Sequence, residues 1–336
     1  MAQYNSMIHY IRLIRPLNVA VVALTMLLFR YCIIDVENYR MYDFLPYMNS
    51  LSFYILLVTT MLITAGGYVI NDIYDVDTDQ INKPDKLIVG KHIEDKDAFN
   101  YYLLLTGLGI LGSFALMYTT KQMKISMLPI IVAVLLYLYA STFKKMMLLG
   151  NAVVAMCAAL PIVLLSIYEL RINQFDTAVI VLFTQGIGLS ALVYATFAFL
   201  TTLIREIIKD VEDIEGDDII GARTFPIVAG INASKSLIIL IQLITLIIIL
   251  LITYYFLVFK LSFAFYGIVL MMLMPLIVQI GLVIWAKTPE QFKWASLAGK
   301  IHMVTGVLTL LFFYSGTAPY IFNQMFNFVS QLLNII

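Results

Sequence analysis

The chain has 336 residues, of which 62% are hydrophobic and only 12% are charged, about half the charged share of an ordinary soluble domain. Lys plus Arg and Asp plus Glu number 21 each, and the two cysteines lie in apolar runs without a Cys-x-x-Cys or Cys–His pattern. This composition indicates an integral membrane protein and argues against a disulfide framework or a zinc site.

A membrane-spanning helix needs roughly 20 mostly apolar residues. We therefore expect an all-α, polytopic membrane protein with about nine transmembrane helices, at about 17–35, 52–70, 101–119, 125–142, 149–168, 178–203, 236–258, 262–286 and 303–322. No polar stretch is long enough for a separate soluble domain, so residues 1–336 are expected to form one transmembrane domain. The tail, 323–336, is too short for a further span and is expected to lie at the membrane interface.

Arg12 and Arg15 precede the first span without a small-residue cleavage pattern, which indicates an uncleaved span and not a signal peptide. If the N-terminus is cytoplasmic, the segments on that side carry 15 of the 21 Lys and Arg residues. Positive charge favours the cytoplasmic side. We therefore expect an inner or plasma membrane location with the N-terminus cytoplasmic and the C-terminus outside.

Two acidic segments end the second and the sixth apolar runs. Each contains the pattern Asp-x-x-Asp-x-x-x-Asp, at Asp72, Asp75 and Asp79 and again at Asp210, Asp213 and Asp217. Each aspartate of the first set precedes its counterpart by 138 residues. Four spans separate the segments, which places both on the same, cytoplasmic, face and suggests pseudo-repeat halves of about 10–145 and 149–290 followed by a ninth helix.

If these segments are helical, the three aspartates of each set fall on one helix face. Two such rows facing each other could not stay fully ionised without cations, because like charges raise one another's pKa. Hard divalent cations and a phosphate are the natural occupants of such an all-oxygen site. A solvated acidic loop is the alternative interpretation of one such segment, but two segments with matching spacing favour a site.

Basic residues accompany both segments. Lys83 and Lys86 follow the first and could neutralise phosphate charge. Arg205 and Lys209 are four residues apart, so both could face one phosphate, although they could also pair with Glu206 or Glu212 along a helix. Other candidate substrate contacts are Asn18, just inside the first span, Tyr139, Lys144 and Lys145, at the end of the fourth span, and Arg223. Lys144 and Lys145 could equally be ordinary positive-inside anchors.

Together these features resemble the UbiA-type intramembrane prenyltransferases. The resemblance rests on Asn71-Asp72-x-x-Asp75-x-x-x-Asp79, Asp213-x-x-x-Asp217, the segment from Tyr139 through Lys144-Lys145 to Gly150-Asn151, and Arg15-Pro16-x-Asn18. It implies nine helices around a central cavity capped by cytoplasmic loops, with Mg²⁺ as cofactor. It also implies that Asn71, Asp75, Asp79, Asp213 and Asp217 hold two Mg²⁺ ions on a prenyl diphosphate, with Asp75, Asp79, Asp213 and Asp217 as the catalytic carboxylates. Asp72 and Asp210 would support the metal ligands, and Lys83, Lys86, Lys144 and Lys145 would contact the diphosphate.

The second motif, residues 205–217, is similar to that of digeranylgeranylglyceryl phosphate synthases. This likeness implies transfer of a prenyl group, expected to be geranylgeranyl, to a glycerol-phosphate ether lipid. Family members commonly carry Arg-Pro where this chain has Lys86-Leu87; Lys keeps the charge but lacks the bidentate fork of Arg.

Two alternatives remain at this point. An aromatic acceptor, such as a quinone or tetrapyrrole precursor of the 4-hydroxybenzoate type, would keep the enzyme class and change the acceptor. The second alternative is a non-enzymatic membrane protein that binds divalent cations. An ion-permeation pathway would require carboxylates deep in several spans, but the mid-span positions are almost free of them. The expected partners are a prenyl diphosphate donor, a lipid or aromatic acceptor and membrane lipids, with no nucleic acid.

Overall fold

The computed structural model describes residues 2–36, 47–170, 186–258, 260 and 262–314. Within these ranges the chain is helical with short connections, and its one strand-like feature is an isolated bridge between Val89 and Ile93. The predicted interfacial tail at 323–336 and the C-terminus lie outside the described residues.

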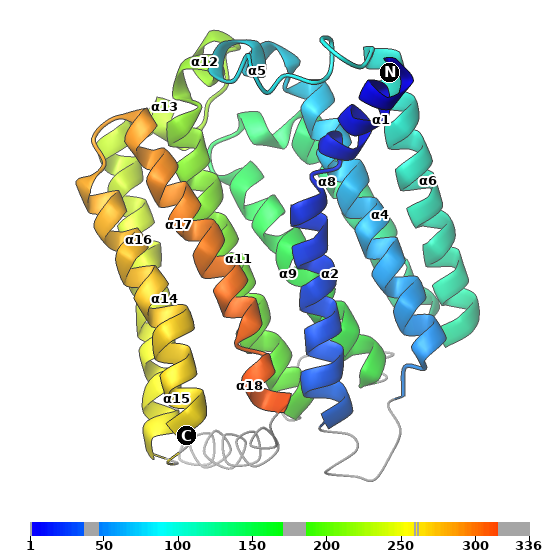
Figure 1. The fold of residues 1–336 in the computed structure, drawn as a ribbon, viewed down its shortest axis with the longest axis vertical. Coiled ribbons are helices and arrows are strands. Elements are labelled where there is room, and N and C mark those ends of the chain that lie inside the picture. Colours follow the sequence, from blue (N-terminus) through cyan, green and yellow to red (C-terminus); the bar gives the residue numbers. More distant parts are fainter. Residues whose placement is uncertain (1, 37–46, 171–185, 259, 261, 315–336) are drawn as a thin grey trace.

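Nine helices of the described residues are long and apolar enough to cross a membrane. They are α2 with η1 (Pro16–Ile34), α4 (Ser50–Tyr74), α6 (Asp95–Thr120), α7 with α8 (Met123–Ser141), α9 (Leu149–Glu169), α11 (Gly186–Glu212), α14 (Ile231–Val258), α15 with η3 and α16 (Ala264–Trp285), and α17 with α18 (Pro289–Phe313). They stand side by side as an upright bundle (Figure 1). The prediction of an all-α, polytopic membrane fold is confirmed.

Short helices complete the described chain, mostly at one end of the bundle. They are α1 (Ala2–Leu13), α5 (Val76–Asn82), η2 (Phe143–Lys145), α12 (Ile214–Ile219) and α13 (Phe225–Ala229). Figure 1 shows α5 and α12 lying across the top of the long helices.

Two predicted spans differ most from the structure in their boundaries. The sixth was expected to end at 203, but α11 continues to Glu212, so Arg205, Lys209 and Asp210 are helical. The ninth was expected to begin at 303, but α17 begins at Pro289 after a capping box formed by Thr288 and Gln291. Hydropathy alone missed these turns because one face of each is charged while the other face is buried.

The hydrophobic core divides near the upper end of the bundle. One cluster of buried residues lies on α4, α6, α8 and the first residues of the chain, and includes Val69 and Tyr102. A second lies on α11, α14, α16 and α17, and includes Ile207 and Phe292. A third cluster, with Phe29 and Tyr168, joins helices from both groups further down. Polar side chains can therefore occupy the interior between the two upper clusters.

Close packing brings α4 against α6. A Cβ atom placed on Gly66 would lie 2.5 Å from Thr106 Oγ1, so α6 approaches α4 more closely there than any larger residue would allow. The contact fixes the end of α4 that carries the first acidic motif.

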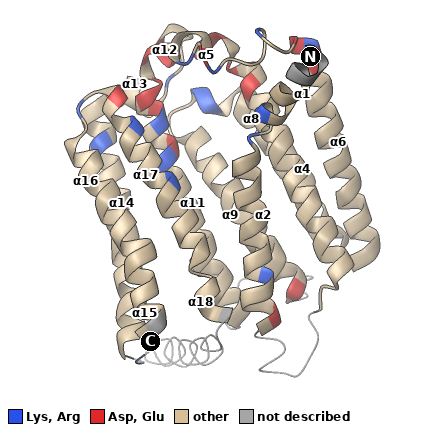
Figure 2. Cartoon of the chain, viewed as in Figure 1, with Lys and Arg blue, Asp and Glu red and all other residues tan. Residues whose placement is uncertain are grey.

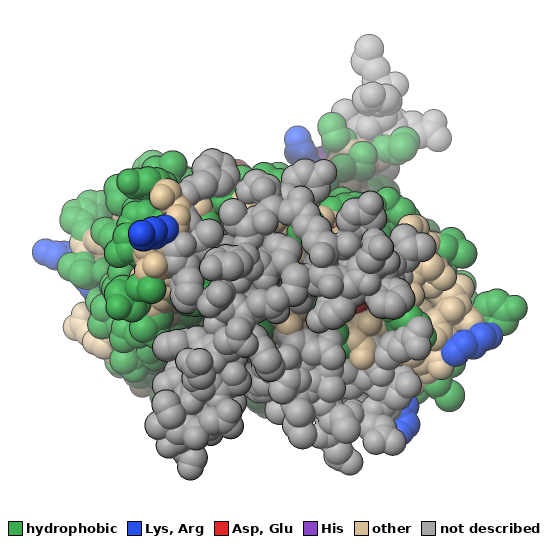
Figure 3. Space-filling model, turned by 90° about the horizontal axis from the view of Figure 1, so that it is seen from below, with side chains coloured by type: hydrophobic (Ala, Val, Ile, Leu, Met, Phe, Trp, Pro, Cys, Tyr) green, Lys and Arg blue, Asp and Glu red, His purple; other side chains and the backbone are tan. Residues whose placement is uncertain are grey.

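Charged side chains gather at the end of the bundle occupied by α5 and α12 (Figure 2). From the opposite end, the described surface is mostly hydrophobic, with scattered Lys and Arg (Figure 3). Both acidic motifs therefore share one end of the protein. The cytoplasmic orientation of that end, the central cavity and the pseudo-repeat halves stay predictions.

Candidate active site

Each acidic motif breaks a long helix at its middle aspartate. Asp75 separates α4 from α5 with φ −93° and ψ 0°, and Asp213 separates α11 from α12 with φ −100° and ψ 10°. Both residues lie in the bridge region of backbone conformation, where many active-site residues are found. The three aspartates of each set would share one face only of an uninterrupted helix, whereas here the first lies on the long helix and the third on the short helix after the break.

Asn82, the last residue of α5, joins the two motifs. Its side-chain amide donates to the Asp213 carbonyl at 2.9 Å and accepts from the Gly216 N–H at 3.0 Å. A Cβ atom on Gly216 would lie 2.5 Å from Asn82 Nδ2, so glycine is what permits this contact. The two hydrogen bonds hold α5 against α12 and bring the first motif to the second.

Two lysines lie between the motifs. Lys83 Nζ pairs with Asp213 Oδ2 at 2.6 Å, so a residue that follows the first motif neutralises the second. Lys144, on η2 between α8 and α9, pairs with Asp75 and is largely buried. Burial alone would lower the pKa of Lys83, but the ion pair with Asp213 outweighs it and raises the pKa overall.

Asp79 and Asp217 have no side-chain hydrogen bond or ion pair among the described residues. Burial raises the pKa of Asp79 to about 6, and repulsion from Asp75 adds to the shift. Burial likewise raises the pKa of Asp217 to about 7, with repulsion from Asp213 and from Asp75 of the other motif. The motifs therefore face each other closely enough to interact, as the spacing predicted.

The remaining motif carboxylates have fixed partners. Asp72 pairs with Arg15 Nη2 at 2.5 Å, and Asp210 accepts from Asn151 Nδ2 at 2.8 Å. Asn151 is buried near the start of α9. These pairs attach α2 to α4 and α9 to α11, which fixes the depth at which each motif leaves the bundle.

A buried charged group lies on α11 before the second motif. Glu206 Oε1 accepts from Arg205 Nη1 at 3.0 Å and from Lys209 Nζ at 2.8 Å. The sequence had left two possibilities open for these cations, and in this structure they pair with Glu206.

Two tyrosines lie between this group and the acidic motifs. The Arg15 guanidinium lies 5.0 Å from the centre of the Tyr68 ring, and Tyr68 also interacts with Asn18, Arg205 and Glu206. Tyr139 is within electrostatic range of Glu206, Asp210 and Asp75. The structure thus places Asn18 and Tyr139 beside the charged groups, and their contact with substrate stays a prediction.

Three predicted substrate contacts stand apart from this interior group. The side chains of Lys86, Lys145 and Arg223 are exposed. Lys145 and Arg223 are neighbours through the backbone, where the Arg223 N–H donates to the Lys145 carbonyl at 2.8 Å. These residues lie at the rim of the acidic end.

The donor atoms present fit a divalent metal ion. Asn71 Oδ1 is buried without a hydrogen-bond partner, and the Asp79 and Asp217 carboxylates are unpaired in the described chain. Oxygen ligands of this kind suit Mg²⁺. In this arrangement no three His, Cys, Asp or Glu groups of the described residues converge on one metal position. Lys83 and Lys144 instead hold Asp213 and Asp75.

Sequence reasoning missed three polar residues of this region: Asn82, Tyr68 and Lys300, an exposed lysine of α17 whose charge interacts with Arg205 and Glu212. The signal for Asn82 was available, because it is a polar residue three positions after Asp79 and directly before Lys83. Tyr68 and Lys300 gave no such signal, since a tyrosine in a span and a lysine near one are ordinary membrane-protein features.

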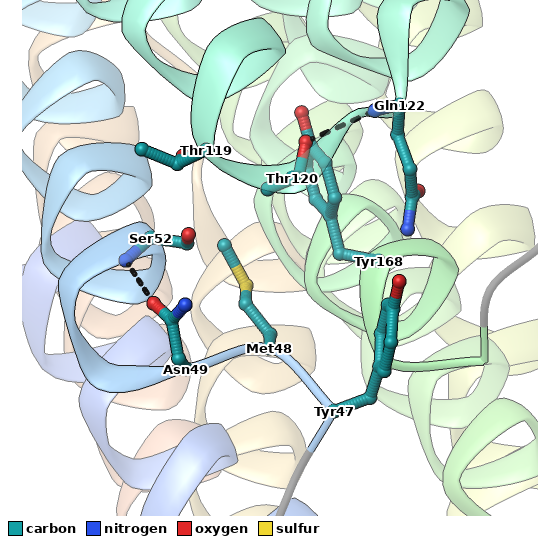
Figure 4. Close-up of a pocket in the computed structure, with 8 residues that line it drawn as sticks. All are labelled: Tyr47, Met48, Asn49, Ser52, Thr119, Thr120, Gln122 and Tyr168. Atoms are coloured by element: carbon teal, nitrogen blue, oxygen red, sulfur yellow. Dashed lines mark hydrogen bonds between the residues drawn. The ribbon is translucent and has the colours of Figure 1, made fainter.

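A polar pocket of about 190 Å³ lies at the opposite end of the bundle (Figure 4). It is lined by Tyr47, Met48, Asn49, Ser52, Thr119, Thr120, Gln122 and Tyr168. None of these is Asp, Glu, Lys, Arg or His, so no ionisable carboxylate, imidazole or basic side chain lines the pocket to balance the charge of a metal ion or a phosphate. The acidic end is the candidate active site.

The fold and the paired Asp-bearing helix breaks define a polytopic membrane protein with two facing acidic motifs at one end. The chain belongs to the UbiA prenyltransferase family, which matches residues 45–304. The predicted family resemblance is confirmed, and the protein is an integral membrane prenyltransferase.

Curated relatives include digeranylgeranylglyceryl phosphate synthases from several organisms. That of Methanosphaera stadtmanae is 32% identical over 246 residues, covering 73% of this chain and 78% of the relative. That of Sulfurisphaera tokodaii is 27% identical over 266 residues, covering 78% and 84%.

Solved structures share the fold. One, from work on the biosynthesis of digeranylgeranylglyceryl phosphate synthase in membranes, has a TM-score of 0.56 at 21% identity and covers 91% of this chain and 99% of its own. Another, a UbiA homolog from Archaeoglobus fulgidus bound to GPP and Mg²⁺, has a TM-score of 0.52 at 17% identity and covers 90% and 99%. At these identities the likeness concerns the fold alone.

Proposed function

We propose that this protein transfers a geranylgeranyl group from its diphosphate to the free hydroxyl of a glycerol-phosphate ether lipid, in a reaction that depends on Mg²⁺. One observation carries the donor half of the proposal. Two Asp-bearing helix breaks face each other, and Lys83 and Lys144 lie between them as cations of a kind that can pair with phosphate. The names of the relatives support the choice of donor and acceptor.

The metal would be held by the motif oxygens. Asn71, Asp75, Asp79, Asp213 and Asp217 are the proposed ligands, while Asp72 and Asp210 stay with Arg15 and Asn151. Bound Mg²⁺ would supply charge stabilisation for the departing diphosphate. Lys83 and Lys144, displaced from their carboxylates, are then free to pair with phosphate oxygens.

The reaction balances without a further co-reactant. The bond between the allylic carbon and the diphosphate oxygen breaks, and the diphosphate leaves with the electron pair. The acceptor hydroxyl oxygen forms a new bond to the allylic carbon and loses its proton, so that an ether, diphosphate and a proton are the products. The chain's own groups stabilise the leaving charge, and the Tyr139 and Tyr68 rings offer faces suited to a developing carbocation.

The membrane arrangement follows the charge distribution. The acidic end is proposed to face the cytoplasm, where a water-soluble diphosphate head enters, while the prenyl chain lies among the spanning helices. Exposed Leu111, Leu251 and Tyr254 on the outer faces of α6 and α14 suit contact with lipid.

A transfer assay with radiolabelled geranylgeranyl diphosphate tests the proposal. The full chain in liposomes is offered geranylgeranylglyceryl phosphate or 4-hydroxybenzoate, with Mg²⁺ or with EDTA. We expect Mg²⁺-dependent product with the glyceryl phosphate, lost in Asp75→Ala and Asp213→Ala. Product with the aromatic acid alone would overturn the acceptor, and no product with either would overturn the proposed reaction.

A further inference from the structure

A group of basic side chains lies deeper in the bundle than the acidic motifs. It consists of Arg205 and Lys209 on α11 and Lys300 on α17, and we refer to it as the α11–α17 basic cluster. It is separate from Lys83 and Lys144, which hold the motif aspartates. None of its members is bonded to a motif aspartate, so the donor site as described does not use the cluster.

Arg205 is incompletely paired. It shares Glu206 Oε1 with Lys209, and its own Nε–H is buried without a hydrogen-bond partner. A buried charged donor without an acceptor is costly, and such a group in a native protein often marks the place of a ligand. The Glu206 carboxylate therefore pairs with both Arg205 and Lys209, and the Arg205 Nε–H remains available to an incoming anion.

Lys300, on α17, has an exposed side chain. Its charge interacts with Arg205 and Glu212 on α11, with Lys86 in the loop after α5, and with Arg15 before α2. These groups come from both halves of the upper bundle, so the ammonium group lies on the side of α17 that faces them. Among the described residues no carboxylate forms an ion pair with it within 4.0 Å.

Arg205 lies too far along α11 to serve the donor diphosphate as well. Arg205 precedes Asp213 by eight residues, about 12 Å along a helix. Side chains lean toward the N-terminus of their helix, which directs Arg205 further from Asp213. A glycerol phosphate held by Arg205 would keep its reacting hydroxyl close to the cluster, because the phosphate and the hydroxyl are on neighbouring carbons of a three-carbon chain.

The charge balance matches a phosphate monoester. Arg205 and Lys209 share one carboxylate and so carry one uncompensated positive charge, and Lys300 contributes a second. A phosphate monoester carries about −1.5 to −2 at pH 7. A flat aromatic carboxylate would compensate only half of this charge.

We propose that the α11–α17 basic cluster binds the phosphate group of the acceptor and places its hydroxyl beside the donor's allylic carbon. This inference rests on the proposed function and names the groups that select its acceptor. Glu206 acts as a positioning residue that keeps Arg205 and Lys209 together.

Binding without turnover is the first test. Full-length protein in nanodiscs with EDTA is titrated with geranylgeranylglyceryl phosphate and with geranylgeranylglycerol, which lacks the phosphate. We expect Arg205→Gln and Lys300→Gln to weaken binding of the phosphate lipid by about 10- to 100-fold and to leave binding of the phosphate-free lipid unchanged. Lys287→Gln, an exposed lysine before α17, is the matched control and should bind both as wild type does.

The variants also separate this site from the donor site. Asp213→Asn should lose Mg²⁺-dependent donor binding yet keep the phosphate lipid, while Arg205→Lys and Lys300→Arg should restore most of the affinity by returning the charge. Wild-type protein that binds both lipids equally, or Gln variants that bind the phosphate lipid as wild type does, would overturn the inference.

Turnover distinguishes the two levels of proposal. If wild type prenylates no glyceryl phosphate, the proposed function fails. If wild type is active and Arg205→Gln and Lys300→Gln keep its KM for the glyceryl phosphate, the function stands and the assignment of the cluster fails. A KM raised about 10- to 100-fold, with donor KM unchanged, supports both.

Discussion

The Asn82 side chain accepts a hydrogen bond from the backbone N–H of Gly216 at 3.0 Å, across 134 residues of sequence. Together with the bond from Asn82 to the Asp213 carbonyl, this contact fixes the separation of the two acidic motifs. Asn82 and Gly216 are not proposed to touch substrate. They would affect donor binding indirectly, by setting the positions of Asp213 and Asp217.

Asn82→Ala should weaken Mg²⁺-dependent binding of a non-hydrolysable prenyl diphosphate by about tenfold or more, because two hydrogen bonds between α5 and α12 are lost. Gly216→Ala should do the same, since its methyl group would displace the Asn82 side chain. The double variant should be little worse than either single one, because both changes remove the same contact. Fully additive effects would contradict the link, and Gly107→Ala, whose added Cβ meets nothing within 4 Å, is the control.

Lys144→Met and Lys83→Met should each lower kcat/KM for the donor by about 10²- to 10³-fold, the usual cost of removing one charge-stabilising donor from an active site. Each change also leaves Asp75 or Asp213 without its cation. Steady-state kinetics at saturating acceptor measure the effect, with exposed Lys96→Met on α6 as the control. Retention of wild-type kcat/KM in both Met variants would remove these lysines from the site.

Metal binding should release protons near neutral pH. In the metal-free protein the pKa of Asp79 is about 6 and that of Asp217 about 7, so part of the population is protonated at pH 6.5. Metal ligands bind as carboxylates, so Mg²⁺ affinity should rise with pH through this range and level off above it. Calorimetric titrations in buffers of different ionisation enthalpy measure the protons released.

Asp217→Asn should abolish most of that proton release at pH 7. Identical heats in all buffers for the wild type would show that the carboxylates are already ionised before Mg²⁺ binds, contrary to this prediction.

Arg30→Met should destabilise the protein without altering the chemistry. Arg30 is buried at the end opposite the acidic motifs, where it pairs with Asp35 at 2.8 Å and with Glu169 at 3.4 Å. Removing one partner of a buried charge pair costs about 3–5 kcal/mol. The apparent melting temperature in detergent should fall, while the folded fraction keeps its donor affinity. A loss of donor affinity at unchanged stability would show that this distant network acts on the site.

Much of the architecture follows from local properties of the sequence. Apolar runs long enough to span a bilayer must form helices, because the bilayer leaves no other partner for backbone amides. The equal spacing of Asp75–Asp79 and Asp213–Asp217, each at the end of such a run, was therefore enough to indicate paired acidic sites at one end. The family resemblance came from the same residues.

Only the tertiary structure decided how these segments meet. The helix breaks at Asp75 and Asp213 appeared only in the structure. The Asn82–Gly216 hydrogen bond and the Lys83–Asp213 ion pair join residues at least 130 positions apart, and no local pattern specifies such pairs. The true start of α17, the helix that carries Lys300, depended on packing against α11 and α16. Hydropathy measures the average of a segment, whereas packing acts on one face of it, so the faces that carry the chemistry appear only when the helices are assembled.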